Sequence, residues 1–145
     1  MKIKVKNLTQ AHSNGKTSVA NYHRNTVNYL RKGRYNLHYH QVDGVRWLLN
    51  KELTGHKLGG ILGDDPGLGK TIQITALIYG NKSKSQVGTT LVVVPLSVLM
   101  QWKEVLDYVL GEENVYVHIG SKRAKGSKIT EQCRGKLVCI TTYGI

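Results

Sequence analysis

The chain has 145 residues, of which 40% are hydrophobic and 21% charged, and its formal net charge is +12. These values predict one globular domain or part of a larger one. No apolar run approaches the roughly 20 residues that span a bilayer, and no apolar segment follows the basic start, so we expect neither a membrane partner nor a signal peptide. Cys133 and Cys139 form no C-x-x-C motif, and we expect reduced thiols in an intracellular protein.

Positive charge is concentrated in the first part of the chain. Residues 1–36 hold eight basic side chains and no acidic one, whereas residues 37–145 hold thirteen basic and nine acidic ones and balance to +4. We therefore predict a basic, partly disordered extension over 1–36, followed by a domain over 37–145. Such an extension suggests a nucleic-acid partner, with Arg31, Lys32 and Arg34 as candidate DNA contacts. The alternative is a solvated tail.

Apolar spacing predicts the elements in chain order. Residues 7–20 are polar and turn-rich and are expected to form a loop. From Tyr39 onward, apolar residues recur at helical spacing up to a loop containing Gly55. Four short apolar runs then predict strands, and three segments between them predict helices: strands at 60–62, 91–94, 115–119 and 137–141, helices at 70–79, 97–110 and 122–132. This alternation predicts an α/β fold with a mostly parallel sheet and right-handed crossovers.

The segment GDDPGLGKTIQ, residues 63–73, is close to a phosphate-binding loop (P-loop). It misses the pattern G-x-x-x-x-G-K-[ST] by one residue, because Asp64 stands where the first glycine should be. The segment follows a predicted strand and opens a predicted helix, which is the context a phosphate cradle requires. Gly67 and Gly69 permit positive φ and lack the Cβ that would block close approach of a phosphate.

Two side chains complete the predicted nucleotide site. Lys70 is expected to reach the β- and γ-phosphates, and the Thr71 hydroxyl is expected to bind the Mg²⁺ that accompanies the nucleotide. The alternative is a chance G-x-G-K-T sequence. No other metal site is expected, because His38 and His40 have no third ligand at a suitable spacing. The full predicted set is Asp64, Asp65, Pro66, Gly67, Leu68, Gly69, Lys70 and Thr71.

With its flanks, the loop reads GGILGDDPGLGKTIQ and resembles motif I of the Swi/Snf-like DNA-translocating ATPases, a branch of the superfamily-two helicases. In that family an Asp followed by another acid commonly replaces the first P-loop glycine. LHYHQVDGVRWL (37–48) resembles the Q motif, LVVVPLSVLMQW (91–102) motif Ia, and ITTYG (140–144) motif Ib. The Asp-Asp pair and PLSVL-x-x-W lean toward the Cockayne-syndrome-B-like repair branch.

The resemblance implies part of the first RecA-like lobe, with three layers around its sheet. It also implies ATP and Mg²⁺ as cofactors, double-stranded DNA and nucleosomes as partners, and a nuclear location in a eukaryote.

Individual motif residues have expected roles. The amide of Gln41 can pair with N6 and N7 of adenine, which predicts a preference for ATP over GTP. Ser97 follows a strand end and is expected to cap the next helix, to hold a DNA phosphate, or both. Thr141 and Thr142 offer hydroxyls to the same DNA backbone, and the resemblance favours Thr142. Trp102 is expected to lie in the core.

The chain departs from the family pattern at several positions. Pro66 stands where Met is usual, and Val105 and Gly144 stand where acids are usual. The sequence reaches Ile145 without an Asp-Glu-Ala-His motif II, and the resemblance places the catalytic acids and the arginine fingers of a second lobe beyond that point. We therefore expect these residues alone not to hydrolyse ATP.

Three function classes remain open. They are part of an ATP-driven double-stranded DNA translocase in remodelling or repair, a non-hydrolysing nucleotide or nucleic-acid binding module, and a small P-loop kinase.

Overall fold

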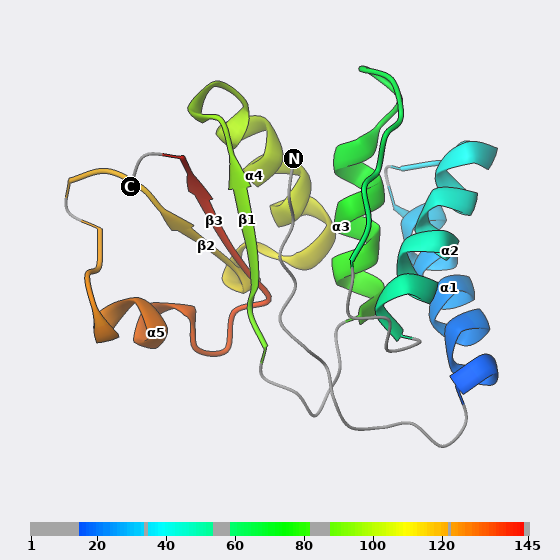
Figure 1. Cartoon of the computed structure of the whole chain (residues 1–145), viewed down its shortest axis with the longest axis horizontal. Coiled ribbons are helices and arrows are strands. Elements are labelled where there is room, and N and C mark those ends of the chain that lie inside the picture. Colours follow the sequence, from blue (N-terminus) through cyan, green and yellow to red (C-terminus); the bar gives the residue numbers. More distant parts are fainter. Residues whose placement is uncertain (1–14, 34, 54–58, 82–87, 122, 144–145) are drawn as a thin grey trace. The chain divides into compact units, whose positions relative to one another are not determined.

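The computed structural model describes residues 15–33, 35–53, 59–81, 88–121 and 123–143. The described residues divide into two compact units, one within residues 15–81 and the other within residues 88–143. The first unit contains α1 (Gly15–Lys32), α2 (Tyr39–Leu53) and α3 (Lys70–Asn81). The second contains β1 (Thr90–Val94), α4 (Leu96–Leu110), the 3-10 helix η1 (Glu112–Asn114), β2 (Val115–His118), α5 (Ser127–Cys133) and β3 (Val138–Thr142) (Figure 1).

In the first unit, each of the three helices packs against the other two. Helix α3 is the most buried, since every residue from Ile72 to Ile78 is buried, as expected for a helix that is apolar on most of its surface. Tyr29 of α1 stacks on Tyr79 of α3, with ring centroids 4.0 Å apart. The core of this unit therefore lies around α3, the helix that follows the P-loop.

Helix α1 was not predicted. Residues 15–20 belong to it, so the expected loop is wrong there, and residues 7–14 lie outside the described part of the chain. Its buried residues His23, Thr26, Val27 and Leu30 follow helical spacing, but two of them are polar and weaken the apolar pattern. His23 Nε2 lies 3.1 Å from the carbonyl oxygen of Val42, and burial lowers the pKa of His23.

The second unit contains a parallel sheet of three strands in the order β1-β3-β2. The register runs from Thr90↔Val138 to Val94↔Thr142 on one side of β3, and from Val115↔Val138 to His118↔Thr141 on the other. Helix α4 contacts the sheet and contributes the buried side chains of Leu99, Trp102 and Leu106.

These features confirm the α/β fold with a parallel sheet. The three observed strands match their predicted ranges to within one residue at each end, and the helix predicted at 97–110 starts at Leu96. Helix α5 is shorter than predicted and begins at Ser127. Among the described residues, no helix is both long and apolar enough to cross a bilayer.

The buried strand predicted at 60–62 is wrong. The structure gives this segment no regular secondary structure. Trp47 of α2 packs closely against Gly60: a Cβ added at Gly60 would lie 2.5 Å from the indole ring.

Candidate nucleotide-binding site

The P-loop leads directly into the N-terminus of α3 (Figure 1). Pro66 and Gly67 form the corner of a turn, in which the Leu68 N–H donates to the Asp65 carbonyl at 3.4 Å. Gly67 has φ of 85°, and a proline followed by a glycine with positive φ is typical of a type II turn. Pro66 therefore suits this corner, although the resembled family usually has Met at its position.

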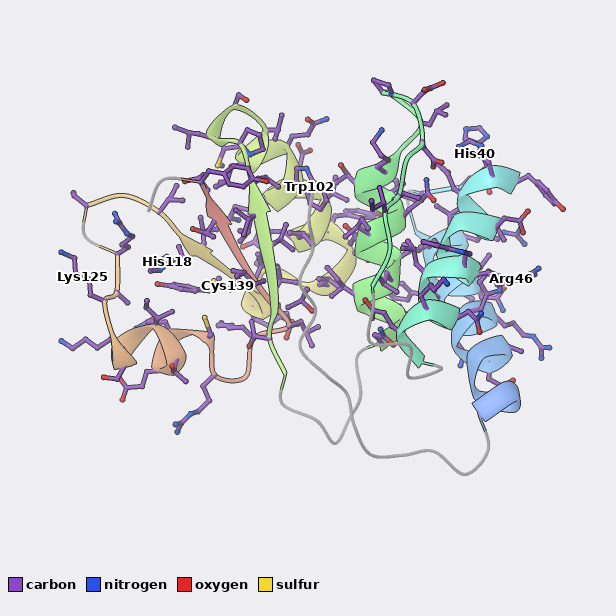
Figure 2. The ribbon with its side chains drawn as sticks, viewed as in Figure 1. His40, Arg46, Trp102, His118, Lys125 and Cys139 are labelled. Atoms are coloured by element: carbon purple, nitrogen blue, oxygen red, sulfur yellow. The ribbon has the colours of Figure 1, made fainter. Side chains whose placement is uncertain are left out.

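Helix α2 holds the loop through Leu68 and Gly69. Gln41 Nε2 donates to the Leu68 carbonyl at 3.1 Å, and His40 Nε2 lies 3.2 Å from the same oxygen. Figure 2 shows His40 at the first turn of α2. Gly69 has φ of 79°, and a Cβ at this position would lie 2.2 Å from Gln41 Nε2. Glycine is thus required there both by backbone conformation and by the approach of Gln41.

Gln41 is buried, and both ends of its amide have partners. Its Oε1 accepts a hydrogen bond from the His38 N–H at 2.9 Å, while its Nε2 contacts Leu68. A side-chain amide has two donor hydrogens and two acceptor lone pairs, so one of each is left for a second partner. The predicted adenine contact is therefore compatible with these bonds.

Lys70 is the first residue of α3, and its side chain folds back on the loop. Its Nζ donates to the carbonyl oxygens of Asp64 at 2.6 Å and Asp65 at 2.8 Å. Next to it, Thr71 is half-buried, and its carbonyl accepts from the Thr75 hydroxyl at 2.9 Å. Lys70 and Thr71 therefore lie together at a helix N-terminus, where backbone N–H groups favour anions.

The residues at this helix end fit a nucleotide phosphate with Mg²⁺. A Cβ added at Gly67 would have no atom within 4 Å, so this side of the loop is open to a ligand. Within the described ranges, no group of three or more His, Cys, Asp or Glu could hold a metal ion by itself. An ion here would share its oxygen ligands between the Thr71 hydroxyl and the phosphates.

The second unit contains the predicted DNA contacts of motifs Ia and Ib. Val94 pairs with Thr142, so the start of α4 and the end of β3 lie at the same edge of the sheet. Ser97 is exposed there, but its predicted capping role is wrong: Pro95 is the N-cap, without a side-chain cap hydrogen bond, and Ser97 is the second residue of α4. The helix begins immediately after the proline.

The two threonines of motif Ib differ. Thr141 is buried, and its hydroxyl donates to the His118 carbonyl at 2.7 Å, so it links β3 to β2. A DNA contact of Thr141 would have to replace this bond, whereas Thr142 is half-buried at the strand end; both contacts remain predictions. Trp102 is 6% exposed and belongs to the core, as predicted; Figure 2 shows it on α4.

A second concentration of positive charge was not predicted. Residues 121–136 hold six basic residues and one acidic one, a net +5, which the average over 37–145 hides. Lys125, Lys128 and Arg134 are exposed around α5, and Figure 2 shows Lys125 on the segment that leads into this helix. In the amino-terminal extension, Arg31 and Lys32 are exposed in the last turn of α1, whereas Arg34 lies outside the described residues.

Residues 40–145 match the family described as the SNF2-related domain. The chain belongs to this family. An uncharacterized ATP-dependent helicase of Schizosaccharomyces pombe, C23E6.02, is 42% identical over 110 residues, which are 73% of this chain and 10% of that protein. The ATP-dependent helicase BRM of Arabidopsis thaliana is 37% identical over 107 residues, 72% of this chain and 5% of BRM.

A third relative is the DNA excision repair protein ERCC-6-like of Danio rerio, 37% identical over 116 residues, 79% of this chain and 8% of that protein. The chain thus spans about a tenth or less of the length of these three relatives. Membership of the SNF2-related domain family confirms the resemblance to Swi/Snf-like ATPases, and the excision repair relative gives weak support to the lean toward the repair branch.

Proposed function

We propose that this SNF2-related chain is the ATP-binding part of an ATP-dependent double-stranded DNA translocase, of the chromatin remodelling or DNA repair type. The observation that carries the proposal is the bond from Gln41 to the Leu68 carbonyl. Leu68 lies two residues before Lys70, so this bond joins the predicted adenine-reading side chain to the phosphate cradle. Both halves of an ATP molecule would then be recognised at one place.

ATP binding would change the hydrogen-bond partners of Lys70. The triphosphate offers charged acceptors, which Lys70 would take in place of the carbonyls of Asp64 and Asp65. Backbone N–H groups at the start of α3 would hold phosphate oxygens, and Thr71 would contribute its hydroxyl to Mg²⁺. The ion, when bound, neutralises charge that develops between the β- and γ-phosphates.

Double-stranded DNA is the proposed polyanionic partner, with nucleosomes as a further candidate. Ser97 and Thr142 lie at the strand-end edge where motifs Ia and Ib meet, and a backbone phosphate there would also face the N-terminus of α4. The exposed basic residues of α1 and of segment 121–136 would add contacts without sequence preference. Relatives described as a chromatin remodelling protein and a chromatin structure-remodeling complex protein support an intracellular, nuclear location in a eukaryote.

A competition titration with ATP and GTP tests the proposal. The chain is expected to bind ATP more tightly than GTP, and Gln41→Ala should narrow this ratio. Because Gln41 also donates to the Leu68 carbonyl, the substitution should weaken the binding of both nucleotides. Only the ratio of the ATP and GTP affinities therefore reports recognition of the base. Gln101→Ala, on an exposed position of α4, is the control and should change neither affinity nor ratio. An unchanged ratio in Gln41→Ala would place adenine recognition elsewhere.

A further inference from the structure

We infer that Gln73 is a positioning residue of the nucleotide site, which fixes Asp64 and through it the carbonyl that holds Lys70. The inference rests on the proposed function, since Lys70 is taken to serve a nucleotide. Gln73 is the fourth residue of α3 and is completely buried. A buried amide costs free energy unless it is hydrogen-bonded, so an apolar side chain would be the simpler choice for a helix core.

The amide of Gln73 has a specific partner in the P-loop. Its Nε2 donates to Asp64 Oδ2 at 2.8 Å. Asp64 occupies the position that the P-loop pattern assigns to glycine, which has no side chain to be held. In this chain the carboxylate of Asp64 therefore gains a donor from the helix that follows the loop.

Asp64 connects this bond to Lys70. The main-chain carbonyl of Asp64 accepts from Lys70 Nζ at 2.6 Å, while its carboxylate accepts from Gln73. Lys70 and Gln73 are three residues apart on α3, so the helix fixes their spacing. A shift of Asp64 would therefore change the position of Lys70 before a nucleotide arrives.

Helix α2 fixes the other end of the amide. Since both carboxylate oxygens of Asp64 are acceptors, Nε2 faces Asp64 and Oε1 faces α2. A Cβ at Gly44 would lie 2.0 Å from Oε1, so no larger residue fits there without moving Gln73. Oε1 is buried and has no conventional hydrogen-bond donor among the described residues. The amide oxygen of Gln73 therefore lies in the space that a side chain at position 44 would take.

Two contacts thus connect the Q-motif helix with the P-loop. Gln41 reaches Leu68 near the end of the loop, and Gly44 reaches Asp64 near its start through Gln73. The alternative is that Gln73 only fills space between α2 and α3. That alternative predicts that Met, which has a similar length and no hydrogen-bonding amide, would serve equally well.

The test is hydrogen–deuterium exchange of the 145-residue chain without nucleotide, followed by an ATP titration. Gln73→Met should speed exchange of the loop amides at 64, 65 and 67–69, of which Leu68 N–H donates to the Asp65 carbonyl, and should weaken ATP binding. Each effect should be roughly tenfold, because a hydrogen bond to a charged group is lost. Leu77→Ala is the matched control, since it removes a buried side chain from the same helix. It should speed exchange along α3 without a selective effect on the loop.

Two further comparisons keep the inference testable if Gln73→Met unfolds. Asp64→Asn keeps an acceptor for Gln73 and should retain loop protection, whereas Asp64→Ala should lose it. Gly44→Ala should loosen the loop in the wild-type background but have little effect beside Gln73→Ala, where the added Cβ has room.

Equal loop exchange in wild type and Gln73→Met, or equal exchange in Asp64→Asn and Asp64→Ala, would overturn the inference. Selective loop loosening in a chain that does not bind ATP would support the positioning of Asp64 and contradict the proposed function.

Discussion

Lys70 binds the loop with donors that it would present to a nucleotide, whereas Gln41 keeps one donor and one acceptor for adenine. Lys70 donates to two carbonyls of the loop, and Gln41 donates to a third. For Lys70, binding of ATP is therefore an exchange of partners, and the net gain of each new bond is smaller than its strength in isolation. The charged phosphates favour this exchange for Lys70, because charge-assisted hydrogen bonds are stronger than those to a neutral carbonyl.

Glu52, in the last turns of α2, predicts a pH dependence of stability. Burial raises the pKa of its carboxyl group from 4.5 to about 7, and Asn81 Nδ2 donates to its Oε2. The folded chain therefore holds this proton more tightly than the unfolded chain. The resulting stabilisation is complete below about pH 4.5 and is lost as the pH rises to about 7; it amounts to about 3 kcal/mol at most.

Glu52→Gln should thus raise the melting temperature by several degrees at pH 8 and change it little at pH 4.5. Thermal unfolding followed by circular dichroism at both pH values measures the difference. Glu112→Gln, on an exposed position of η1, is the control and should behave as wild type. A Glu52→Gln variant that is no more stable than wild type at pH 8 would show that the carboxylate is solvated.

At the scale of elements, the last turn of α1 presents Arg31 and Lys32, two of the basic residues proposed to contact DNA. Neutralising Arg31, Lys32 and Arg34 should weaken binding to unrelated duplexes alike. It should also reduce the slope of log K against log salt by up to about 2.7, from about 0.9 for each lost phosphate contact. Fluorescence anisotropy at several salt concentrations measures both effects.

The segment around α5 offers a matched comparison. Neutralising Lys125, Lys128 and Arg134 removes the same amount of charge from a different exposed surface. If only this variant loses affinity, segment 121–136 is the DNA contact and the amino-terminal extension is a solvated tail. If neither variant changes binding or its salt dependence, neither basic surface contacts DNA.

Elements whose pattern is local could be predicted from the sequence, and those that depend on distant partners could not. The runs that form β1, β2 and β3 are apolar and β-branched, so each was placed to within one residue at either end. The run at 60–62 is similarly apolar but forms no strand in the structure, which its local pattern does not reveal. Helix α1 could not be predicted from apolar spacing, because the polar residues His23 and Thr26 lie on its buried face.

The same distinction holds within the candidate site. The P-loop residue types, the positive φ of Gly67 and Gly69, and the buried Trp102 follow from the sequence. The hydrogen bonds from Gln73 to Asp64 and from Thr141 to His118 join residues whose pairing depends on packing, and no sequence motif predicts them.

At the scale of the whole molecule, the 145 residues are expected to bind ATP without turning it over. They contain no Asp-Glu-Ala-His sequence, and a P-loop alone neither orients the attacking water nor completes the Mg²⁺ coordination. Steady-state hydrolysis with and without duplex DNA should therefore remain at background. A two-lobed protein that carries these residues together with motif II should show DNA-stimulated hydrolysis under the same conditions.

ATP hydrolysis by the 145 residues themselves would contradict this expectation, and Asp64, Asp65 and Glu104 would then be the candidate catalytic acids. Background activity in both proteins would favour the non-hydrolysing binding module.

The most direct measurement of the central claim is a calorimetric titration of the chain with Mg-ATP, in wild type and Lys70→Ala. Lys70 is the positive side chain at the start of α3, so its loss should weaken binding by roughly a hundredfold or more. Lys128→Ala, an exposed lysine of the other unit, should bind like wild type. Tight binding by wild type and Lys128→Ala, with loss in Lys70→Ala, is the predicted result; equal affinity in all three would contradict a nucleotide site at this loop.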